Sequence, residues 1–410
     1  MLVGLRVLEV GGGPAAVCGK MLADLGAEVI KVEPPGGEAA RRVGPFVRDR
    51  EGDDDSLSWI AYNTDKQSIT LDLAAPDGQA LFRRLVAGSA LVVDALEAGQ
   101  MARWGLDGAS LRRERPALVT TSITPFGQTG PYSRYKADDL VVMSMAGHVQ
   151  ITGDADRRPL NISLPQAPML AGADAAVGSL IALRHARRRG VGQHVDISMQ
   201  HSAAWFLGTM VPYQELAGVR GQRIGTLRGG GSSGARQRQV WPCRDGHVFF
   251  FMIGGQQGAK TCRELVRWMA DEGQDDPVLQ SFDWESFDMA SASQELIDRL
   301  SDPLAAFFAT RTKKQVLDAA VGRGISVCPL LSMGDLLDDA SLNARDFWMR
   351  LPHPALPEGL HYPTRYVRAS ASETGTVSPP PRVGEHNAAV HAELGLSDGE
   401  IGRLRGAGVV

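Results

Sequence analysis

The chain has 410 residues, enough for two or three domains of about 150 residues each. Its formal net charge is −4 and no dense Lys/Arg patch contains interleaved aromatic residues, which argues against a nucleic-acid-binding protein. Four scattered cysteines without C-x-x-C spacing favour reduced thiols in a cytoplasmic protein that has no zinc site. We expect neither a signal peptide nor a membrane span, because no uninterrupted apolar run reaches about 18 residues.

A glycine-rich turn, Gly11 to Pro14, links a predicted strand at 5–10 to a predicted helix at 15–25. One interpretation is an NAD fingerprint: Gly11, Gly13 and Ala16 fit G-x-G-x-x-A, and Glu33 ends the next strand as a candidate ribose ligand. The other is a turn that cradles a different nucleotide-bearing group. Since Pro14 offers no N–H to a phosphate, the second interpretation is favoured.

Strand and helix signals alternate through the first half of the chain, which predicts a parallel sheet covered on both faces. The further strands are expected at 29–32, 68–72, 91–94, 118–123 and 194–198, and helices are expected from Pro76, at 169–188 and at 199–216. A glycine segment at 228–234 indicates a boundary. Beyond it we expect a smaller α+β domain, with a strand at 248–252 and helices at about 257–270, 293–309 and 313–323, then an extended stretch at 352–381 and two short C-terminal helices.

Four sequence blocks occur in a distinctive order and spacing: 23–37, 127–132, 192–199 and 384–387, the last followed by Leu394-Gly395-Leu396-Ser397. With them the chain resembles the class III coenzyme A transferases, a family that includes formyl-CoA transferase, carnitine CoA-transferase and α-methylacyl-CoA racemase. The resemblance extends from about Val7 to Val409. It implies an α/β fold whose Rossmann-like large domain (1–215 and 331–410) carries a smaller α+β domain (216–330), and two chains that interlock as a dimer.

The same resemblance implies a pocket for a CoA thioester, which is a substrate and not a permanently bound cofactor. Gly12, Gly13 and Ala15 of the first turn would face CoA, and Met101 and Arg103 match the family positions beside the adenine. An arginine makes physical sense there, since a guanidinium can stack on a purine or pair with a phosphate. No metal is expected.

Family chemistry depends on an Asp that attacks the acyl-CoA thioester. Counting back from Gly192-Gln193 places Ala167 at this nucleophile position, give or take one residue, and neither neighbour is acidic. Asp174, about two helical turns further on, and Asp156, in a polar turn, are the weak substitutes. His148 stands where the racemase branch has a His, but its Asp partner is missing.

The chain keeps the family scaffold but lacks the nucleophile. In this it resembles the Asp-lacking subunit of transferases that move CoA from succinyl-CoA to an aromatic succinate such as benzylsuccinate. The catalytic Asp would then lie on a homologous partner chain. The alternatives are a self-sufficient homodimeric CoA-ester enzyme with a non-standard nucleophile, a non-catalytic CoA-binding protein, and an NAD oxidoreductase. Gly229 to Gly231 are expected to form either a mobile loop over the active site or a linker.

Overall fold

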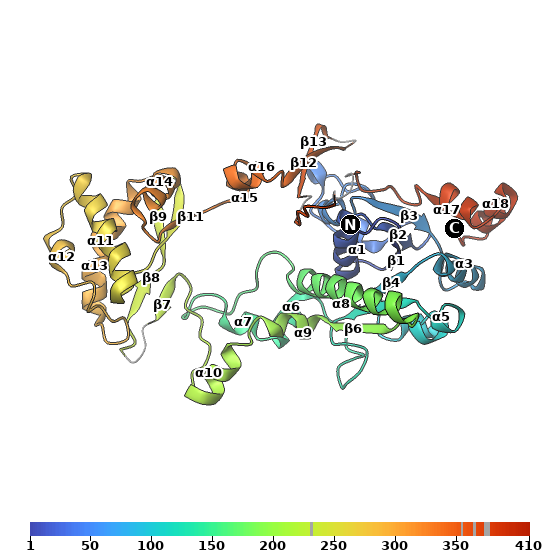
Figure 1. Ribbon diagram of the computed structural model, residues 1–410, viewed down its shortest axis with the longest axis horizontal. Coiled ribbons are helices and arrows are strands. Elements are labelled where there is room, and N and C mark those ends of the chain that lie inside the picture. Colours follow the sequence, from blue (N-terminus) through green and yellow to red (C-terminus); the bar gives the residue numbers. More distant parts are fainter. Residues whose placement is uncertain (230–232, 354–355, 364–365, 373–377) are drawn as a thin grey trace. The chain divides into compact units, whose positions relative to one another are not determined.

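The computed structural model describes residues 1–229, 233–353, 356–363, 366–372 and 378–410, which form two compact units (Figure 1). Unit 1 comprises Met1–His148, Asn161–Val219 and Ala340–Val410, and unit 2 comprises Val149–Leu160 and Arg220–Asp339. The small domain was predicted at 216–330, so the sequence placed both of its ends a few residues too early. The sequence also gave no sign that 149–160 belongs with the second unit.

Unit 1 is built on a parallel six-stranded sheet of order β3-β2-β1-β4-β5-β6. Its strands are β1 Arg6–Val10, β2 Glu28–Glu33, β3 Lys66–Thr70, β4 Leu91–Asp94, β5 Val119–Thr124 and β6 His194–Ser198. The α/β class and the Rossmann-like sheet are therefore confirmed. The strand order reverses between β1 and β4, and ligands of such doubly wound sheets bind outside the carboxyl ends of the strands at this reversal.

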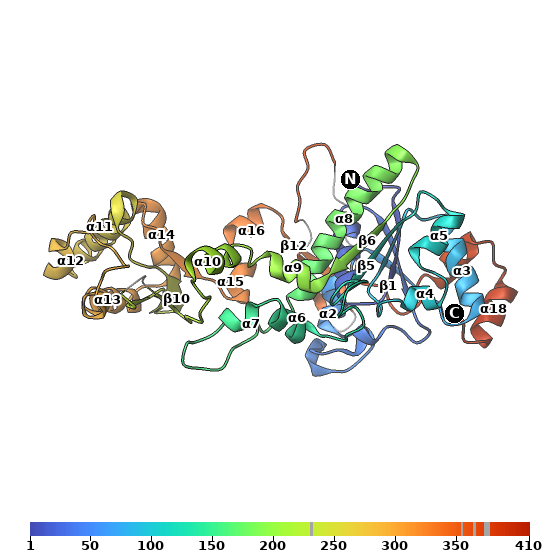
Figure 2. The same ribbon diagram turned by 90° about the horizontal axis from the view of Figure 1, so that it is seen from below.

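Helices cover both faces of this sheet (Figure 2). α3 Pro76–Ala87, α5 Gly108–Glu114, α17 Asn387–Glu393 and α18 Asp398–Gly406 enclose one apolar core with alternate side chains of the strands. On the other face α1 Pro14–Asp24 packs against α8 Ala167–Arg189. A Cβ at Gly172 would lie 2.6 Å from Val17, so the small residues of α8 permit this close approach.

α8 is long and apolar enough to cross a membrane by length and composition alone, and 44% of its most apolar window is buried. It contacts α1, β5 and β6 along its length, so it is a helix of the unit 1 core. It is the one helix of this kind among the described residues.

The single helix expected at 199–216 was wrong. The structure has α9 Met199–Trp205 and α10 Met210–Ala217, separated by a turn. Pro212 explains the break, because a proline within a continuous helix removes one backbone hydrogen bond and clashes with the carbonyl four residues earlier. In the first turn of a new helix the same proline is tolerated.

The C-terminal segment closes the edge of the sheet at β3. Asn387 accepts a hydrogen bond from the backbone N of Thr70 (2.8 Å), and Gly384 N donates to Ser68 Oγ (3.0 Å). The backbone N of Ser68 also donates to His386 Nδ1 (3.2 Å). Residues from both ends of the chain thus complete one sheet.

The remaining elements of unit 1 are short: η1 Ala39–Arg42, η2 Val47–Asp49, α2 Leu57–Tyr62, α4 Gln100–Arg103, α6 Asp139–Met145, α16 Ala340–Ala344 and the antiparallel pair β12 Trp348–His353 and β13 Leu356–Pro363. α7 His148–Ile151 runs across the boundary between the units. The pair β12–β13 replaces part of the unpaired extended stretch that the sequence predicted.

Unit 2 has the α+β composition that the sequence predicted. Its strands are β7 Leu227–Gly229, β8 Arg236–Arg238, β9 Val240–Cys243, β10 Gly246–Phe249 and β11 Cys328–Leu330. Its helices are α11 Gly255–Asp271, α12 Pro277–Ser281, α13 Gln294–Ala309, α14 Lys313–Arg323 and α15 Met333–Leu337. Aromatic side chains such as Trp241, Phe250 and Phe308 form the centre of its core. Gly230 and Gly231 lie outside the described residues.

Candidate active site

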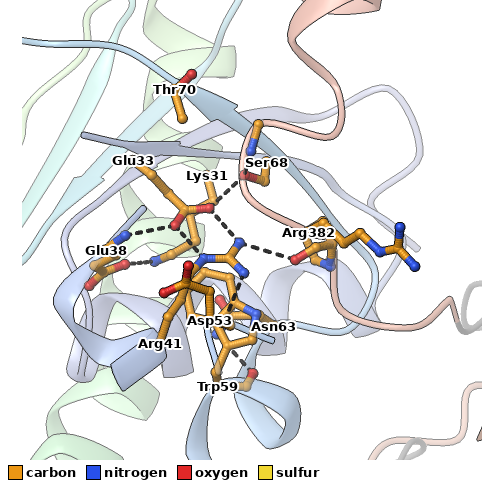
Figure 3. Close-up of polar contacts among 12 residues, drawn as sticks. Lys31, Glu33, Glu38, Arg41, Asp53, Trp59, Asn63, Ser68, Thr70 and Arg382 are labelled. Carbon is orange, nitrogen blue, oxygen red and sulfur yellow. Dashed lines mark hydrogen bonds and ion pairs between the residues drawn. The ribbon is translucent and has the colours of Figure 1, made fainter. Parts of the chain in front are cut away.

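Glu33, the candidate ribose ligand, is fully buried at the end of β2 and is held by four hydrogen bonds (Figure 3). Arg41 Nε and Nη2 donate to its two carboxylate oxygens at 2.7 Å each, Ser68 Oγ donates at 2.5 Å and Glu38 N at 2.9 Å. Burial opposes ionisation of Glu33, but these hydrogen bonds and the Arg41 charge outweigh it and lower the pKa of the carboxyl. Glu33 is not open to a ribose, which removes the acid that an NAD site needs.

Arg41 uses its remaining donors on other groups. Its Nη1 donates to Asp54 Oδ1 (2.9 Å) and its Nη2 to the carbonyl oxygen of Pro381 (3.1 Å), and its Cζ lies 3.6 Å from the centre of the Trp59 ring. The side chains of Glu33, Arg41 and Trp59 thus form a closed ionic and aromatic contact that we call the Glu33–Arg41 cluster. It ties β2 to the C-terminal segment.

A second ionic group lies beside it on the same face of the sheet. Lys31 pairs with Glu9 (2.7 Å) and Glu38 (2.6 Å), and Lys66 also pairs with Glu9 (2.8 Å). Burial, offset in part by Glu9, lowers the pKa of Lys66 to about 8. These buried ion pairs join the side chains of β1, β2 and β3.

The main cavity of unit 1 has a volume of about 830 Å³ and lies where β1, β4, β5 and β6 end. The cavity is lined by Pro14, Leu96, Pro125 and Met199, each of which follows one of these strands in the chain. Its position is therefore the one that the reversal of strand order favours for ligands. The size falls within the range of about 300–1,000 Å³ that is typical of small-molecule sites.

The predicted CoA-binding residues do not all reach this cavity. Arg103, at the end of α4, lines it, whereas Met101 is buried and lines a smaller neighbouring cavity of about 250 Å³. The first turn contributes Pro14 to the lining. A Cβ at Gly12 would lie 2.0 Å from Glu38 Oε1, and Ala15 is buried, so these two residues serve the packing of the turn. Gly13 has φ 53° and precedes α1, where glycine is favoured.

The smaller cavity contains a second buried acid. Asp94, the last residue of β4, accepts a hydrogen bond from Ser122 Oγ (2.6 Å), and burial raises the pKa of its carboxyl to about 6. Thr120 and His194 lie on the same wall, 3.1 Å apart between Oγ1 and Nδ1. Asp94 did not emerge from the sequence, where it ends an ordinary apolar strand.

Ala167 begins α8, and its backbone N–H is already bound. Asp139 Oδ1 accepts hydrogen bonds from Gln166 N (2.7 Å) and Ala167 N (2.8 Å), and Asp139 Oδ2 accepts from Asn161 Nδ2 (3.0 Å). Pro168, the next residue, lines the main cavity. The residues around the predicted nucleophile position thus carry no carboxylate of their own, while Asp139 reaches the start of α8 from α6 and also borders the cavity.

The weak substitutes lie elsewhere. Asp174 is exposed on α8 and does not line the main cavity, and Asp156 belongs to unit 2. His148 lies 2.8 Å, through Nε2, from the carbonyl oxygen of Ala203 and is also not part of the cavity lining. Within unit 1 the structure therefore brings neither Asp174 nor His148 to the lining of the main cavity.

The loop after β5 supplies residues that sequence reasoning missed. Lys136 forms an ion pair with Glu97 (2.6 Å) at the rim of the main cavity, and Tyr135 lies there too, 5.2 Å from Tyr132 between ring centres. The sequence does indicate these residues, because Tyr135 and Lys136 follow the block 127–132 in the loop after a predicted strand. Arg103 and Lys136 thus place two cations among the mixed charges of this rim, where they can pair with the phosphates of a ligand.

The described residues contain no group of three or more His, Cys, Asp or Glu side chains that could hold a metal ion. Cys18, Cys243, Cys262 and Cys328 are free thiols, and Cys18 and Cys262 are buried. Burial raises the pKa of the Cys262 thiol to about 11, which opposes a role as a thiolate nucleophile.

The sheet order and the cavity at its reversal define a doubly wound α/β protein of the class that binds nucleotide-bearing ligands. The chain belongs to CoA-transferase family III, whose family model matches residues 2–387. It is a CoA-transferase, and such enzymes use CoA thioesters as substrates.

Similar proteins span nearly the whole chain. It is 31% identical to succinyl-CoA:(R)-benzylsuccinate CoA-transferase subunit BbsE of Thauera aromatica, over 99% of this chain and 97% of that protein. It is also 31% identical to succinyl-CoA–D-citramalate CoA-transferase of Chloroflexus aurantiacus, over 99% and 97%. The solved structure of a CaiB/BaiF family protein from Brucella suis matches with a TM-score of 0.81 and 26% identity, over 96% of this chain and 98% of that one.

Proposed function

We propose that this chain is the non-nucleophilic subunit of a cytoplasmic hetero-oligomeric CoA-transferase. It would move CoA from succinyl-CoA to an aromatic succinate such as benzylsuccinate, with the catalytic Asp on a homologous partner chain. The observation that carries the proposal is the start of α8, where Ala167 stands between Gln166 and Pro168 and the nearest backbone N–H groups are capped by Asp139. A methyl group cannot attack a thioester.

In this proposal the partner's Asp attacks the carbonyl carbon of succinyl-CoA and releases the CoA thiolate, leaving a mixed anhydride. The thiolate then attacks the aspartyl carbonyl, which frees succinate and leaves CoA bound to the Asp as a thioester. A carboxylate of the aromatic succinate attacks the carbonyl carbon of that thioester, which releases the CoA thiolate and forms a second mixed anhydride. The thiolate then attacks the acceptor's carbonyl carbon in this anhydride, which gives the CoA thioester of the aromatic succinate and frees the Asp carboxylate. Arg103 and Lys136 of this chain would pair with CoA phosphates.

An unpartnered apolar surface supports a second chain. Trp205 is 82% exposed, Leu216 is 87% exposed and Ile181 on α8 is 64% exposed. Phe206, next to Trp205, and Val177, one turn before Ile181 on α8, are also exposed. Soluble chains seldom leave so many large apolar side chains uncovered, so α8 to α10 are suited to pack against another polypeptide.

The relatives are consistent with this assembly. BbsE is named as a subunit of a benzylsuccinate transferase, and the succinyl-CoA–L-malate CoA-transferase of Chloroflexus aurantiacus is named by alpha and beta subunits, each 27% identical to this chain. Since BbsE is similar over almost the full length, it supports both the succinyl-CoA donor and the aromatic acceptor.

One observation favours a second candidate, a self-sufficient homodimer. Asp139 places a carboxylate at the start of α8 and at the main cavity, which makes it the best-placed acid of this chain for a non-standard nucleophile. Its oxygens already accept three hydrogen bonds, which occupy their lone pairs and reduce the nucleophilicity of the carboxylate. We therefore favour the hetero-oligomer.

The test is to assay CoA transfer from succinyl-CoA to benzylsuccinate by the purified chain alone, by the chain with an Asp-bearing homologue, and by the same mixture with that homologue's catalytic Asp replaced by Ala. Only the intact mixture should be active. Hydroxylamine trapping should find the acyl or CoA adduct on the partner. An active homomer with an adduct on this chain would reject the proposal. If the chain bound CoA but no mixture transferred it, the proposal would be rejected in favour of a non-catalytic CoA-binding protein.

A further inference from the structure

Unit 2 contains a pocket of about 310 Å³ to which no role has been assigned so far. Phe251, Met252, Phe287 and Met289 line it together with the polar Gln237 and the charged Arg228 and Asp288. Met252 and Phe287 are buried in the core of unit 2, whereas the Phe251 and Met289 side chains are partly exposed. A pocket that combines aromatic and thioether residues with a few polar and charged groups is suited to a small organic ligand. We call it the aryl pocket.

The walls of the aryl pocket are fixed by the fold. Gln237 is buried and accepts a hydrogen bond from Met252 N (2.7 Å) while its Nε2 donates to Met252 O (3.0 Å). A Cβ at Gly254 would lie 1.6 Å from the carbonyl oxygen of Phe287, so this close contact of two wall segments requires glycine. The pocket is therefore formed before any ligand arrives.

Arg228 is placed to pair with an anion. It lies opposite Gln237 in the β7–β8 register, and its Cζ is 4.5 Å from the centre of the Phe251 ring. Asp288 also lines the pocket, but its carboxylate is bound within its own turn by Ala290 N (2.9 Å) and Ser291 Oγ (3.0 Å). A guanidinium stacked on an aromatic ring retains in-plane N–H donors for a carboxylate.

We infer that the aryl pocket binds the acceptor acid, an assignment that rests on the proposed function. An aryl-substituted succinate has two carboxylates and one aromatic ring. One carboxylate becomes the thioester, whereas the other keeps its charge and needs a cation. Arg228 supplies that cation, and the partly exposed side chains of Phe251 and Met289 contact the ring.

Named relatives give this division of labour a chemical basis. The acids in their names, benzylsuccinate, citramalate, glutarate, oxalate and malate, all carry two carboxylates, and only benzylsuccinate adds an aromatic ring. Arg228 therefore recognises the feature that is common to these acids. The aromatic and thioether walls recognise the feature that distinguishes one of them.

The experiment titrates the full-length chain with benzylsuccinate and with succinate by calorimetry, and with CoA separately. Benzylsuccinate should bind about 10- to 100-fold more tightly than succinate, as burial of one aromatic group provides. Phe251→Ala should remove this preference, and Arg228→Gln should weaken both acids about tenfold. Arg238→Gln, an exposed arginine stacked on Trp241 outside this pocket, is the matched control and should change neither.

Circular dichroism verifies that each variant is folded, and Arg228→Gln, being exposed, provides the test if Phe251→Ala does not fold. Benzylsuccinate binding that is no tighter than that of succinate, or that both variants leave unchanged, would overturn the assignment while CoA binding and transfer still supported the proposed function. Loss of CoA binding in the wild-type chain would instead contradict the proposed function itself.

Discussion

Two positions in unit 1 invite an acidic residue, and the chain treats them in opposite ways. At the end of β2 Glu33 is present but enclosed by Arg41 and Ser68. At the start of α8 the main cavity is open, but Ala167 and Pro168 bring no acid to it. A sequence motif can thus supply the right residue in a place where no ligand reaches, and a site can keep its shape after losing the residue that reacts.

The contrast also shows which interactions build the fold and which remain for chemistry. In the Glu33–Arg41 cluster the carboxylate and the guanidinium are engaged by other groups of the protein, so they contribute stability and are not open to a ligand. The rim of the main cavity retains Arg103 and Lys136 near the surface, where their charges can meet a phosphate. Four predictions test this difference.

The largest effect is expected from Arg41→Ala. Removal of the guanidinium leaves the buried Glu33 carboxylate without its cation, which should lower the free energy of unfolding by about 3–5 kcal/mol. Arg42→Ala is the matched control, because the adjacent Arg42 pairs with Asp53 at the surface and should cost less than about 1 kcal/mol. Urea denaturation followed by circular dichroism measures both, and equal losses would show that the cluster is not special.

The effect of Glu33→Gln on the free energy of unfolding should depend on pH. The pKa of Glu33 is held below 4.5 in the folded chain, so the unfolded chain takes up this proton at a higher pH than the folded one. The resulting stabilisation is complete above the unfolded pKa and is lost as the pH falls through the folded pKa.

Unfolding of wild type and Glu33→Gln should therefore be compared from pH 7 to pH 3. The variant should lose about 1–3 kcal/mol at pH 7 and have a shallower decline in stability below about pH 4.5. The CoA affinity of Glu33→Gln should equal that of the wild type. An identical acid limb in the two proteins would mean that another carboxyl controls it.

Asp139→Ala tests the acid nearest to the open position. Loss of the cap on Gln166 N and Ala167 N should cost about 0.5–2 kcal/mol in unfolding free energy. CoA transfer by the reconstituted complex should persist, because the carboxylate holds α8 and does not attack the thioester. A loss of transfer by orders of magnitude in a folded variant, as removal of a nucleophile produces, would support the homodimeric alternative.

The smallest effect is expected at the cavity rim. Arg103→Gln should weaken CoA binding about tenfold or less, because an exposed charge–phosphate contact contributes about 1 kcal/mol. Arg113→Gln, an exposed arginine on α5 outside the cavity, should leave affinity unchanged. Equal CoA affinity in wild type and Arg103→Gln would place the phosphates elsewhere.

Much of unit 1 could be predicted from sequence, because short apolar runs and the small-residue pattern of α8 are local signals. The strands at 29–32 and 91–94 and the helix from Pro76 depend only on neighbours in the chain. The break between α9 and α10 was also local, since Pro212 marks it, but the apolar residues on both sides concealed it.

The ion pairs of the site depend on contacts between distant residues and could not be predicted. Arg41 lies in a polar loop that gives no sign of burial, and its contact with Pro381 spans 340 positions. Asp139 reaches Ala167 across 28 positions, so its role as a cap for α8 emerges only after folding. Met101 and Arg103 are two residues apart, yet α4 directs them to different cavities.

The C-terminal segment that closes β3 bears on how the protein is made. Arg41 and Ser68 leave the ribosome long before Pro381 and Gly384, their partners across the sheet edge. At about 5–20 residues per second, the 340 positions from Arg41 to Pro381 correspond to about 20 to 70 s of translation. During that interval the C-terminal segment that hydrogen-bonds to β3 has not yet been made. Chaperones that bind the nascent chain should therefore bind mainly at β3 and dissociate once the C-terminal segment has emerged.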